Sequence, residues 1–241
     1  MRIRFTTSHP KDLSDELCQA FKNLDKLCHH IHLPVQSGSN RILKKMNRKY
    51  TRELYLDRID HLRRLCPAIA ITSDFIVGFP GETEADFEQT LALAGQVSFD
   101  NLFAFKYSDR PSAPARKFNP KVAEAVKNDR LQTLLDMQKE ITAGKNSSLV
   151  GTCQAVLIEG QSKRSLNDEI NLPAHSGQWT GRTSTNKIVH FSLDGFSIDG
   201  PPEGTMIWIK IEKALAHSLW GRPVSIGSHS DNLKGESSYA A

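Results

Sequence analysis

The sequence predicts an α/β domain built on a parallel sheet, followed by a small all-β barrel of the OB type. Two observations support this fold class. In the first 146 residues, short apolar runs alternate with segments of helical periodicity, which is typical of β-α units and a parallel sheet. From Thr152 onward the apolar runs are strand-like and are separated by Gly, Asn and Asp turns, as in small barrels. The change of pattern places the domain boundary near Ser147.

The first β-α unit begins with a strand at Ile3–Phe5, and its helix follows Asp12 as the N-cap. The second strand lies near Cys28–Val35, and a short helix follows Ser39. Apolar residues at helical spacing form the inner stripe of the first helix: Leu13, Leu17, Phe21 and Leu24.

The third strand, Ala68–Val77, is nearly continuous in Ile, Val, Thr and Phe, as expected for a strand that is covered on both faces. A longer helix precedes it and begins at Thr51. The helix after it opens at Thr83, and Asp86 completes a capping box. The inner faces of these two helices carry Tyr55, Ile59, Leu62 and Cys66, and then Phe87, Leu91 and Ala94.

An extended run, Asn101–Ser108, leads through a loop with prolines to a long helix that starts at Asn119 and Pro120 and ends near Gly144. We assign residues 1–146 to the first domain, 147–216 to the barrel and 217–241 to a polar tail. The strand-like runs are Thr152–Glu159, Gln178–Thr183, Lys187–Leu193 and Met206–Leu215, with a shorter one at Leu219–Val224.

Composition excludes several classes of protein. With 39% hydrophobic and 24% charged residues, the chain is neither disordered nor collagen-like. No run approaches the ~20 apolar residues of a membrane span, and no signal peptide follows Met1, so we expect a cytoplasmic protein without a membrane partner. The cysteines are too far apart for a disulfide framework or a close-spaced metal motif: Cys18, Cys28, Cys66 and Cys153.

The net charge of +4 is too small to demand a nucleic-acid partner, but its distribution is uneven. Residues 1–146 carry 23 basic and 18 acidic side chains, whereas residues 147–241 carry 8 and 9. The run Arg41–Arg52 holds six cations and no anion. Such a run is either a solvated helix face or a surface that contacts phosphate.

Polar loops follow all three predicted strands: Thr6–Pro10, Pro34–Asn40 and Gly78–Thr83. Because ligands of parallel sheets bind beyond the carboxyl ends of the strands, these loops predict a binding site. Their hydroxyls, amides and glycines suit a polar ligand that carries a ribose or an amino acid. A purely structural interpretation also exists, since Ser39 and Thr83 are good helix N-caps.

His30 and His32 alternate onto one face of the second strand. We predict no metal site there, because no carboxylate or thiolate lies at matching spacing and structural zinc requires four ligands. The sequence also has neither a GxSxG nucleophile elbow nor a P-loop, so no catalytic residue is assigned.

Several strings, in order, resemble the core motifs of the radical-SAM methylthiotransferases: RIRFTTSHP, HLPVQSGSNRILKKMNRKYT, SDFIVGFPGETEADF and YSDRPSAPA. The later strings LIEGQSK, GRT and NK resemble the TRAM domain of that family, an OB-like RNA-binding module. The resemblance covers about residues 1–220. Within the family, the spellings HLPVQSGS and MNRKYT favour the members that methylthiolate isopentenylated adenosine in tRNA.

The resemblance implies that the first domain is the second half, strands four to six, of the six-stranded (β/α)6 partial barrel of radical-SAM enzymes. The family uses S-adenosyl-L-methionine and two [4Fe-4S] clusters, and its CxxxCxxC loop and preceding three-cysteine domain are absent here. The chain therefore looks like the carboxyl-terminal half of a transferase and is expected to be inactive without the missing amino-terminal half.

By the same resemblance, residues of the three loops are assigned to the cofactor: Ser8, Gln36, Ser39, Asp74, and the backbone of Val77 and Gly78. Residues of the barrel are assigned to the anticodon arm of tRNA: Lys163, Arg164, Arg182, Asn186 and Lys187. No residue is assigned to a metal.

Three alternatives stay open. The chain could be a tRNA-binding piece without catalysis. The substrate could be a threonylcarbamoyl-adenosine in tRNA, or a ribosomal-protein aspartate, as in relatives within the family. An unrelated α/β enzyme with a sugar-phosphate substrate would explain the polar loops but not the appended barrel.

Overall fold

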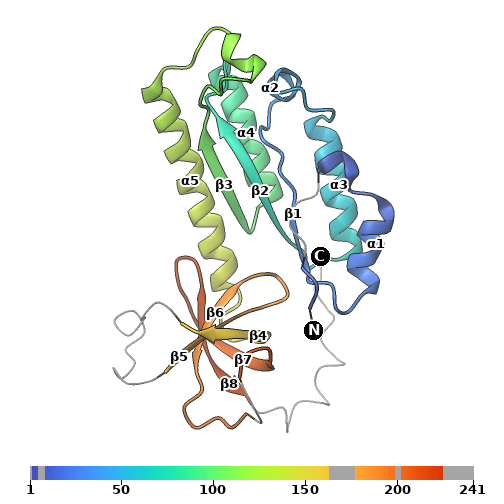
Figure 1. Cartoon of the computed structure of the whole chain (residues 1–241), viewed down its shortest axis with the longest axis vertical. Helices are drawn as coiled ribbons and strands as arrows, with labels where there is room; N and C mark the ends of the chain where they lie inside the picture. Colours follow the sequence, from blue (N-terminus) through green and yellow to red (C-terminus); the bar gives the residue numbers. More distant parts are fainter. Residues whose placement is uncertain (1, 5–8, 163–176, 199–201, 225–241) are drawn as a thin grey trace. The chain divides into compact units, whose positions relative to one another are not determined.

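A computed structural model describes residues 2–4, 9–162, 177–198 and 202–224 of the chain (Figure 1). The chain forms two compact units, Met1–Lys145 (unit 1) and Asn146–Ala241 (unit 2). Among the described residues, no helix is long and apolar enough to cross a membrane.

Unit 1 is built on a parallel sheet of three strands in the order β1-β2-β3 (Figure 1). The strands are β1 (His30–His32), β2 (Ala70–Val77) and β3 (Asn101–Lys106). Of the strand expected at Ile3–Phe5, the described residues show one isolated parallel bridge, between Ile3 and Leu27, and Phe5 lies outside the described residues.

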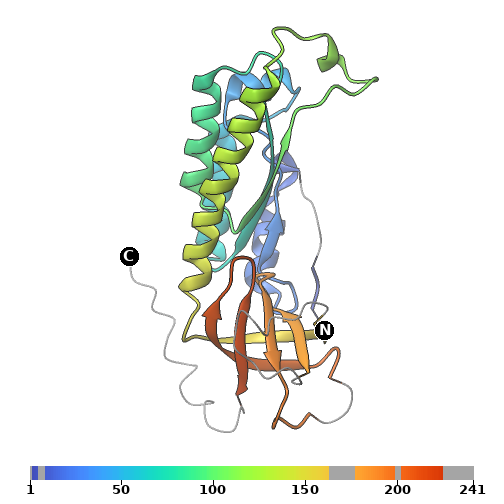
Figure 2. The ribbon, with the colours of Figure 1, turned by 90° about the vertical axis from the view of Figure 1, so that its left-hand side faces the viewer.

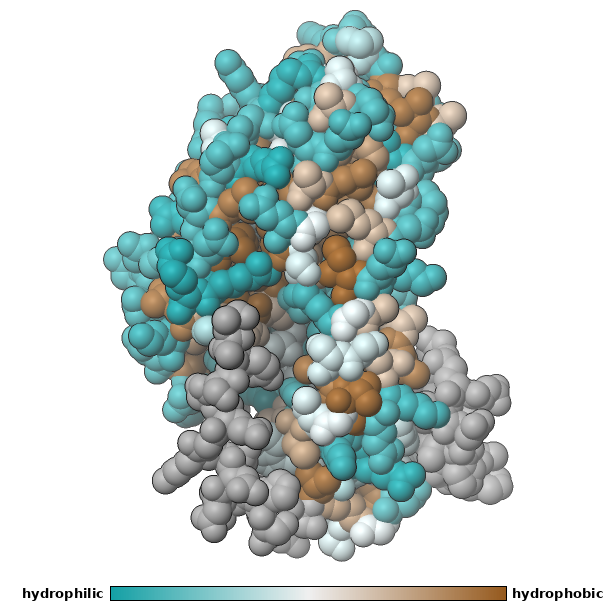
Figure 3. Space-filling model, turned by 180° about the vertical axis from the view of Figure 1, so that it is seen from behind, coloured by the Kyte–Doolittle hydropathy of each residue, from teal (hydrophilic) through white to brown (hydrophobic). Residues whose placement is uncertain are grey.

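Helices accompany the strands in the expected β-α order, and α4 and α5 lie against one side of the sheet (Figure 2). On the side turned away from the viewer in Figure 1, the surface of unit 1 is mostly hydrophilic and has smaller hydrophobic areas among the hydrophilic residues (Figure 3). The α-helices are α1 (Asp15–Asn23), α2 (Asn40–Lys45), α3 (Arg52–Leu65), α4 (Glu84–Val97) and α5 (Glu124–Ser147). Two short 3-10 helices are η1 (Pro10–Asp12) and η2 (Pro114–Lys117).

The core of unit 1 lies between the sheet and the helices, and it takes Ile71, Phe75 and Val77 from β2. The inner stripe predicted for α3 is confirmed, since Tyr55, Ile59, Leu62 and Cys66 are all buried. We define the open face as the sheet face that carries the other set of alternating residues: His30, His32, Thr72, Asp74, Ile76, Phe103 and Phe105.

The expectation that the third strand is covered on both faces holds for its first half, where Ala70 and Thr72 on the open face are buried, and not for its second half. Asp74 on the open face keeps 30% of its side chain exposed. Across the register from Asp74 and Ile76 lie Phe103 and Phe105, which are 48% and 57% exposed. The apolar run of β2 therefore reflects one deeply buried face, and its other face remains accessible at this end.

Two predicted helix starts are also wrong. α1 begins after Ser14, whose Oγ accepts the N–H of Leu17 at 3.2 Å, whereas Asp12 ends η1. The helix ends at Asn23, so Leu24, predicted to be on the buried stripe, lies at its C-cap and is 54% exposed. α5 begins at Glu124 instead of Asn119 and Pro120, since the Pro120 carbonyl accepts the N–H of Gly81 (2.7 Å).

Unit 2 is a closed barrel with the strand order β4-β5-β6-β8-β7. All neighbours are antiparallel except β6 and β8, which run parallel. Because β8 pairs with both β6 and β7, the barrel extends to Val224, and the assignment of residues 217–241 to a tail is wrong for its first part. The strands are β4 (Cys153–Gln161), β5 (Gln178–Arg182), β6 (Ile188–Ser192), β7 (Met206–Ala214) and β8 (Leu219–Val224).

Apolar side chains that alternate along the strands fill the barrel: Val156, Ile158, Val189, Phe191, Ile207, Ile209, Ile211 and Leu219. Glycine is required where strands approach closely. A Cβ at Gly181 would lie 2.3 Å from the Leu157 carbonyl oxygen, and one at Gly221 would lie 2.2 Å from that of Lys210. Trp208, between the core isoleucines of β7, is half-buried on the outer side.

Candidate functional site

The loops after β1 and β2 are joined through one buried carboxylate, Asp86. Its oxygens accept hydrogen bonds from Ser39 Oγ (2.6 Å), the Thr83 N–H (2.8 Å) and the Arg41 guanidinium. Burial alone would raise the pKa of Asp86, but these hydrogen bonds hold its pKa well below the ordinary value. The carboxylate therefore stays ionised and ties the two loops together.

Ser39 and Thr83 both act as helix caps, as the structural interpretation of these loops proposed. Ser39 is buried, and its Oγ accepts the N–H of Ile42 at the start of α2 while donating to Asp86. Thr83 and Asp86 form the predicted capping box of α4. The Ser39 hydroxyl is thus engaged inside the protein.

A second buried ion pair supports the loop after β2, and no sequence pattern predicted it. Arg130 on α5 lies 2.9 Å from Glu82 and 2.9 Å from Glu84. Glu82 also accepts the N–H of Gly78 at 2.6 Å. Burial raises the pKa of Glu82, and the Gly78 N–H and Arg130 oppose that rise.

The loop after β2 requires glycine at position 78. Gly78 adopts φ of +71°, and a Cβ there would lie 2.4 Å from Cγ of Lys127. Its N–H donates to Glu82, and the carbonyl of the preceding Val77 accepts the N–H of Tyr107 at 2.9 Å. The two backbone groups assigned to the cofactor therefore each have a partner in the protein.

Gln36 and Asp74, both assigned to the cofactor, lie side by side at the sheet edge. The Gln36 N–H donates to the Asp74 carbonyl (2.8 Å), and the Gln36 carbonyl accepts the N–H of Ile76 (2.9 Å). Gln36 has φ of +76° and is buried. The expectation that the ends of parallel strands bring these residues together is met at these two positions.

The open face carries a polar group around His32. The His32 Nε2 lies 3.4 Å from an Asp74 carboxylate oxygen, and its Nδ1 lies 2.9 Å from Thr72 Oγ1. His30 Nε2 is 3.4 Å from the same hydroxyl, so the two histidines share one face as the alternation predicts. The Phe103 ring packs edge-on against His32 at 5.9 Å. This arrangement can form hydrogen bonds to a polar ligand beside an aromatic surface.

In the barrel, Arg182 is the last residue of β5, and Asn186 and Lys187 lie in the turn that joins β5 to β6. Arg182 pairs with Glu159 (3.2 Å) and donates to Oδ1 of Asn186 (3.0 Å). The Lys187 N–H donates to Oγ1 of Thr183 (3.0 Å). The structure thus brings these three assigned residues together, whereas Ser8, Lys163 and Arg164 lie outside the described residues.

The described residues do not form a metal or cluster site. They contain no group of three or more His, Cys, Asp or Glu side chains that could hold a metal ion. Cys18, Cys28 and Cys66 are buried, and Cys153 is exposed. Burial raises the pKa of the Cys18 and Cys66 thiols, which disfavours the thiolate that a cluster needs.

The chain is similar in sequence to a family of tRNA-modifying enzymes. The model of the Radical SAM superfamily matches residues 1–94. A "tRNA-2-methylthio-N(6)-dimethylallyladenosine synthase" from Desulfosudis oleivorans is 53% identical over 93% of this chain and 48% of its own length. Synthases with the same name from Syntrophus aciditrophicus and Clostridium botulinum are 50% and 48% identical, over 91% and 92% of this chain.

These matches confirm the resemblance to the radical-SAM methylthiotransferases, and the chain spans about half the length of the curated relatives. Among solved structures, coproporphyrinogen III oxidase from Escherichia coli, described as a Radical SAM enzyme, gives a TM-score of 0.48 at 14% identity. The match covers 90% of this chain and 50% of that chain, and a likeness at this level does not identify a fold.

Proposed function

We propose that this chain, homologous to tRNA-2-methylthio-N(6)-dimethylallyladenosine synthases, is the carboxyl-terminal part of an enzyme that methylthiolates isopentenylated adenosine beside the tRNA anticodon. The observation that carries the proposal is identity of about 50% over more than nine-tenths of the chain, across both units. Similarity of this extent includes the loop edge of the sheet as well as the barrel.

Unit 1 is proposed to hold S-adenosylmethionine on the open face, where the donor set fits a polar ligand. S-adenosylmethionine supplies the radical chemistry of this family when it is bound with the clusters. The partly exposed Asp74 carboxylate can accept hydrogen bonds from ribose hydroxyls or an ammonium group, and His32 orients it. Gln36, hydrogen-bonded to Asp74 through its backbone, supplies an amide at the same edge.

The other assigned residues are proposed to position this edge. Ser39 ties the loop after β1 to Asp86, and Gly78 ties the loop after β2 to Glu82. The Val77 carbonyl, which accepts from Tyr107, fixes the end of β2 against β3. Ser39, Val77 and Gly78 would then act on the cofactor through the geometry of the loops.

The iron-sulfur clusters do not fit the described residues of this chain, so no step is assigned to a cluster here. We propose that an amino-terminal part of the complete enzyme holds both clusters. The support is the length of the relatives, of which this chain spans 44–48%.

Unit 2 is proposed to be an OB-like TRAM barrel that binds the anticodon arm. Its strand order and the parallel β6–β8 pair agree with the five-stranded Greek-key barrel of that class. OB-type barrels bind nucleic acid through one face and its loops. The proposed contacts are Arg182 at the end of β5, Asn186 and Lys187 on the β5–β6 turn, and Lys163 and Arg164.

A chimera tests the proposal. The matching stretch of the Desulfosudis oleivorans synthase is replaced by this chain and expressed in a bacterium that lacks its own methylthiolating enzyme. We expect 2-methylthio-N6-isopentenyladenosine in digested tRNA by mass spectrometry, as with the intact synthase as control. A folded chimera with normal iron content that leaves isopentenyladenosine unmodified would contradict the proposal.

The same digest separates the alternatives. Methylthiolation of threonylcarbamoyl-adenosine, or of a ribosomal protein in the same cells, would assign the chain to another member of the family. A chimera that binds tRNA but modifies nothing would favour a binding piece without catalysis.

A further inference from the structure

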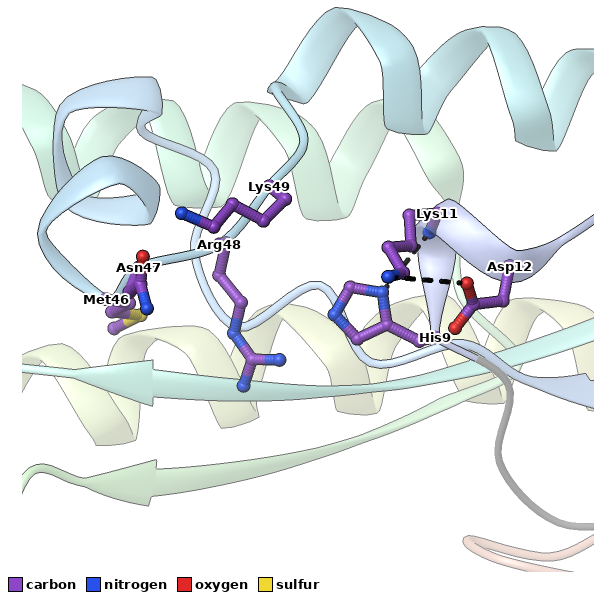
Figure 4. A pocket seen from close by; sticks show the side chains of 7 residues that line it. All are labelled: His9, Lys11, Asp12, Met46, Asn47, Arg48 and Lys49. Atoms are coloured by element: carbon purple, nitrogen blue, oxygen red, sulfur yellow. Dashed lines mark hydrogen bonds and ion pairs between the residues drawn. The ribbon is translucent and has the colours of Figure 1, made fainter.

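A pocket of about 300 Å³ lies between the η1 turn and the loop that joins α2 to α3, and cations dominate its lining (Figure 4). Lys11 lies 3.8 Å from the single carboxylate of the lining, Asp12, and Arg48 and Lys49 add two further cations. His9 and Asn47 add a ring nitrogen and an amide. The volume is at the lower end of the range of small-ligand sites, so the pocket suits one compact anionic group.

The pocket is anchored to the loop after β1. His9 Nδ1 accepts the N–H of Lys11 (3.3 Å), which leaves Nε2 to carry the proton and donate. The His9 ring packs edge-on against Tyr50 at 5.3 Å, and the Tyr50 hydroxyl donates to the Val35 carbonyl (3.0 Å). One wall of the pocket is therefore held by the loop that carries Gln36.

The opposite wall is fixed by backbone hydrogen bonds that leave the side chains available. The Arg48 N–H donates to the Leu43 carbonyl (2.9 Å), and the N–H of Asn47, at φ of +58°, donates to the Lys44 carbonyl (3.0 Å). In the part of the chain that the structure describes, no carboxylate lies within ion-pair distance of Arg48 or Lys49. Arg41 of the same basic run is instead paired with Asp86.

The electrostatics of the pocket favour an anionic ligand. Burial lowers the pKa of His9, and the nearby charges of Arg48 and Lys11 lower it further, while Asp12 opposes them. The positive charges of Arg48 and Lys11 repel a protonated His9, and an anion bound between His9 and Arg48 would offset that repulsion. An arginine guanidinium presents parallel N–H donors that match two phosphate oxygens, and lysine adds a point charge.

We propose that this pocket binds a backbone phosphate of the tRNA substrate, with Arg48 and Lys49 as the principal contacts and His9 and Asn47 as further donors. The inference rests on the proposed function, because it takes RNA as the source of the phosphate. It adds an RNA contact on unit 1, separate from the barrel residues assigned above.

The test measures binding of an anticodon stem-loop RNA to the full chain as a function of salt. The variants are Arg48→Gln, Lys49→Gln and their combination, and Arg48→Lys is the conservative rescue. Arg64→Gln and Lys139→Gln, at exposed positions on α3 and α5, are matched controls. We expect the slope of log K against log salt to fall by about 0.7 when one phosphate contact is lost, and Arg48→Lys to keep the wild-type slope.

A second readout follows His9 by NMR. The His9 pKa should rise when the RNA is added, because the phosphate offsets Arg48. Inorganic phosphate alone serves as a comparison, and Arg48→Gln should raise the His9 pKa of the free chain.

The outcomes separate the inference from the function on which it rests. Wild-type binding with unchanged slopes in the Arg48 and Lys49 variants overturns the pocket inference alone. An equal fall of the salt slope in Arg64→Gln and Lys139→Gln also overturns the pocket inference, since any lost cation would then have the same effect. A chain that binds no RNA overturns both, and a His9 response to inorganic phosphate without RNA binding would reassign the pocket to a small phosphorylated ligand.

Discussion

Arg130 and Glu82 form a buried ion pair, with a nitrogen-to-oxygen distance of 2.9 Å across 48 positions of sequence. Their side chains are only 7% and 1% exposed. Glu82 accepts the Gly78 N–H as well, so the pair joins α5 to the loop at the end of β2. The loop after β2, the strand that carries Asp74, is therefore held in place by a residue of α5.

Replacement of Arg130 by Met should lower the free energy of unfolding by about 3 to 5 kcal/mol, because Glu82 would be left as an unpaired buried charge. Urea denaturation of the full chain gives the value. Adding Glu82→Gln to Arg130→Met should recover part of the loss. If Arg130→Met costs no more than Arg64→Met on the exposed surface of α3, the pair does not act as a buried salt bridge.

Asp86→Asn should destabilise the chain at pH 7 by about 1.5 to 3 kcal/mol, the range for hydrogen bonds to charged groups. The native pKa of Asp86 is lowered, so its contribution is complete above the unfolded value of about 3.9 and is lost as the pH falls through the native pKa. The difference between wild type and Asp86→Asn should therefore be constant from about pH 5 to 7 and shrink below about pH 4.

Urea denaturation at several pH values measures this difference. Asp60→Asn, at an exposed position on α3, is the matched control and should show almost no difference at any pH. A gap between wild type and Asp86→Asn that widens on acidification would be inconsistent with a lowered pKa.

Asp74→Asn should weaken S-adenosylmethionine binding to the complete chimeric enzyme by about 1 to 3 kcal/mol, because a charged hydrogen-bonding partner of the ligand is lost. Equilibrium dialysis with labelled cofactor measures the affinity. Asp60→Asn is again the control. Equal affinities in wild type and Asp74→Asn would make Asp74 a structural partner of His32 only.

Gly78→Ala should destabilise unit 1 by about 1 to 3 kcal/mol, since Ala is strained at φ of +71° and its Cβ would overlap Lys127. Gly144→Ala, in the helix α5, adds a methyl group with no neighbouring atom within 4 Å and should instead stabilise by about 1 kcal/mol. Thermal unfolding of the two variants should move in opposite directions. A shift of both in the same direction would argue against the close packing at Gly78.

The chain alone should not assemble a [4Fe-4S] cluster, since the described residues offer no convergent ligands and three of its thiols are buried. Anaerobic reconstitution followed by iron quantification provides the test, with the intact Desulfosudis oleivorans synthase as the positive control. Stoichiometric iron in the reconstituted chain would refute the prediction.

The sequence predicted those parts of the site that depend on local rules. Ser39 and Thr83 cap their helices as expected, because an N-cap needs only a hydroxyl and the backbone amides two or three residues later. Gln36 and Asp74 meet because parallel strands end at one edge.

The parts that were not predicted depend on distant partners. Nothing in the local pattern pairs Arg41 with Asp86 or Arg130 with Glu82, which lie 45 and 48 positions apart. The start of α5 was placed too early because Pro120 fits a helix N-terminus locally, whereas its carbonyl is used by Gly81. The resemblance to a family supplied the reaction class, which no residue pattern in this chain specifies.

The pairing of β8 sets an order of events during synthesis of unit 2. β8 lies between β6 and β7, so until Val224 has left the ribosome the four earlier strands keep two open edges. The barrel cannot close as each strand emerges. It closes only when β8, its last strand, pairs with both β6 and β7. Nascent chains that stall between Ala214 and Leu219 should therefore expose β-sheet edges, and should be bound by chaperones more strongly than chains that extend past Val224.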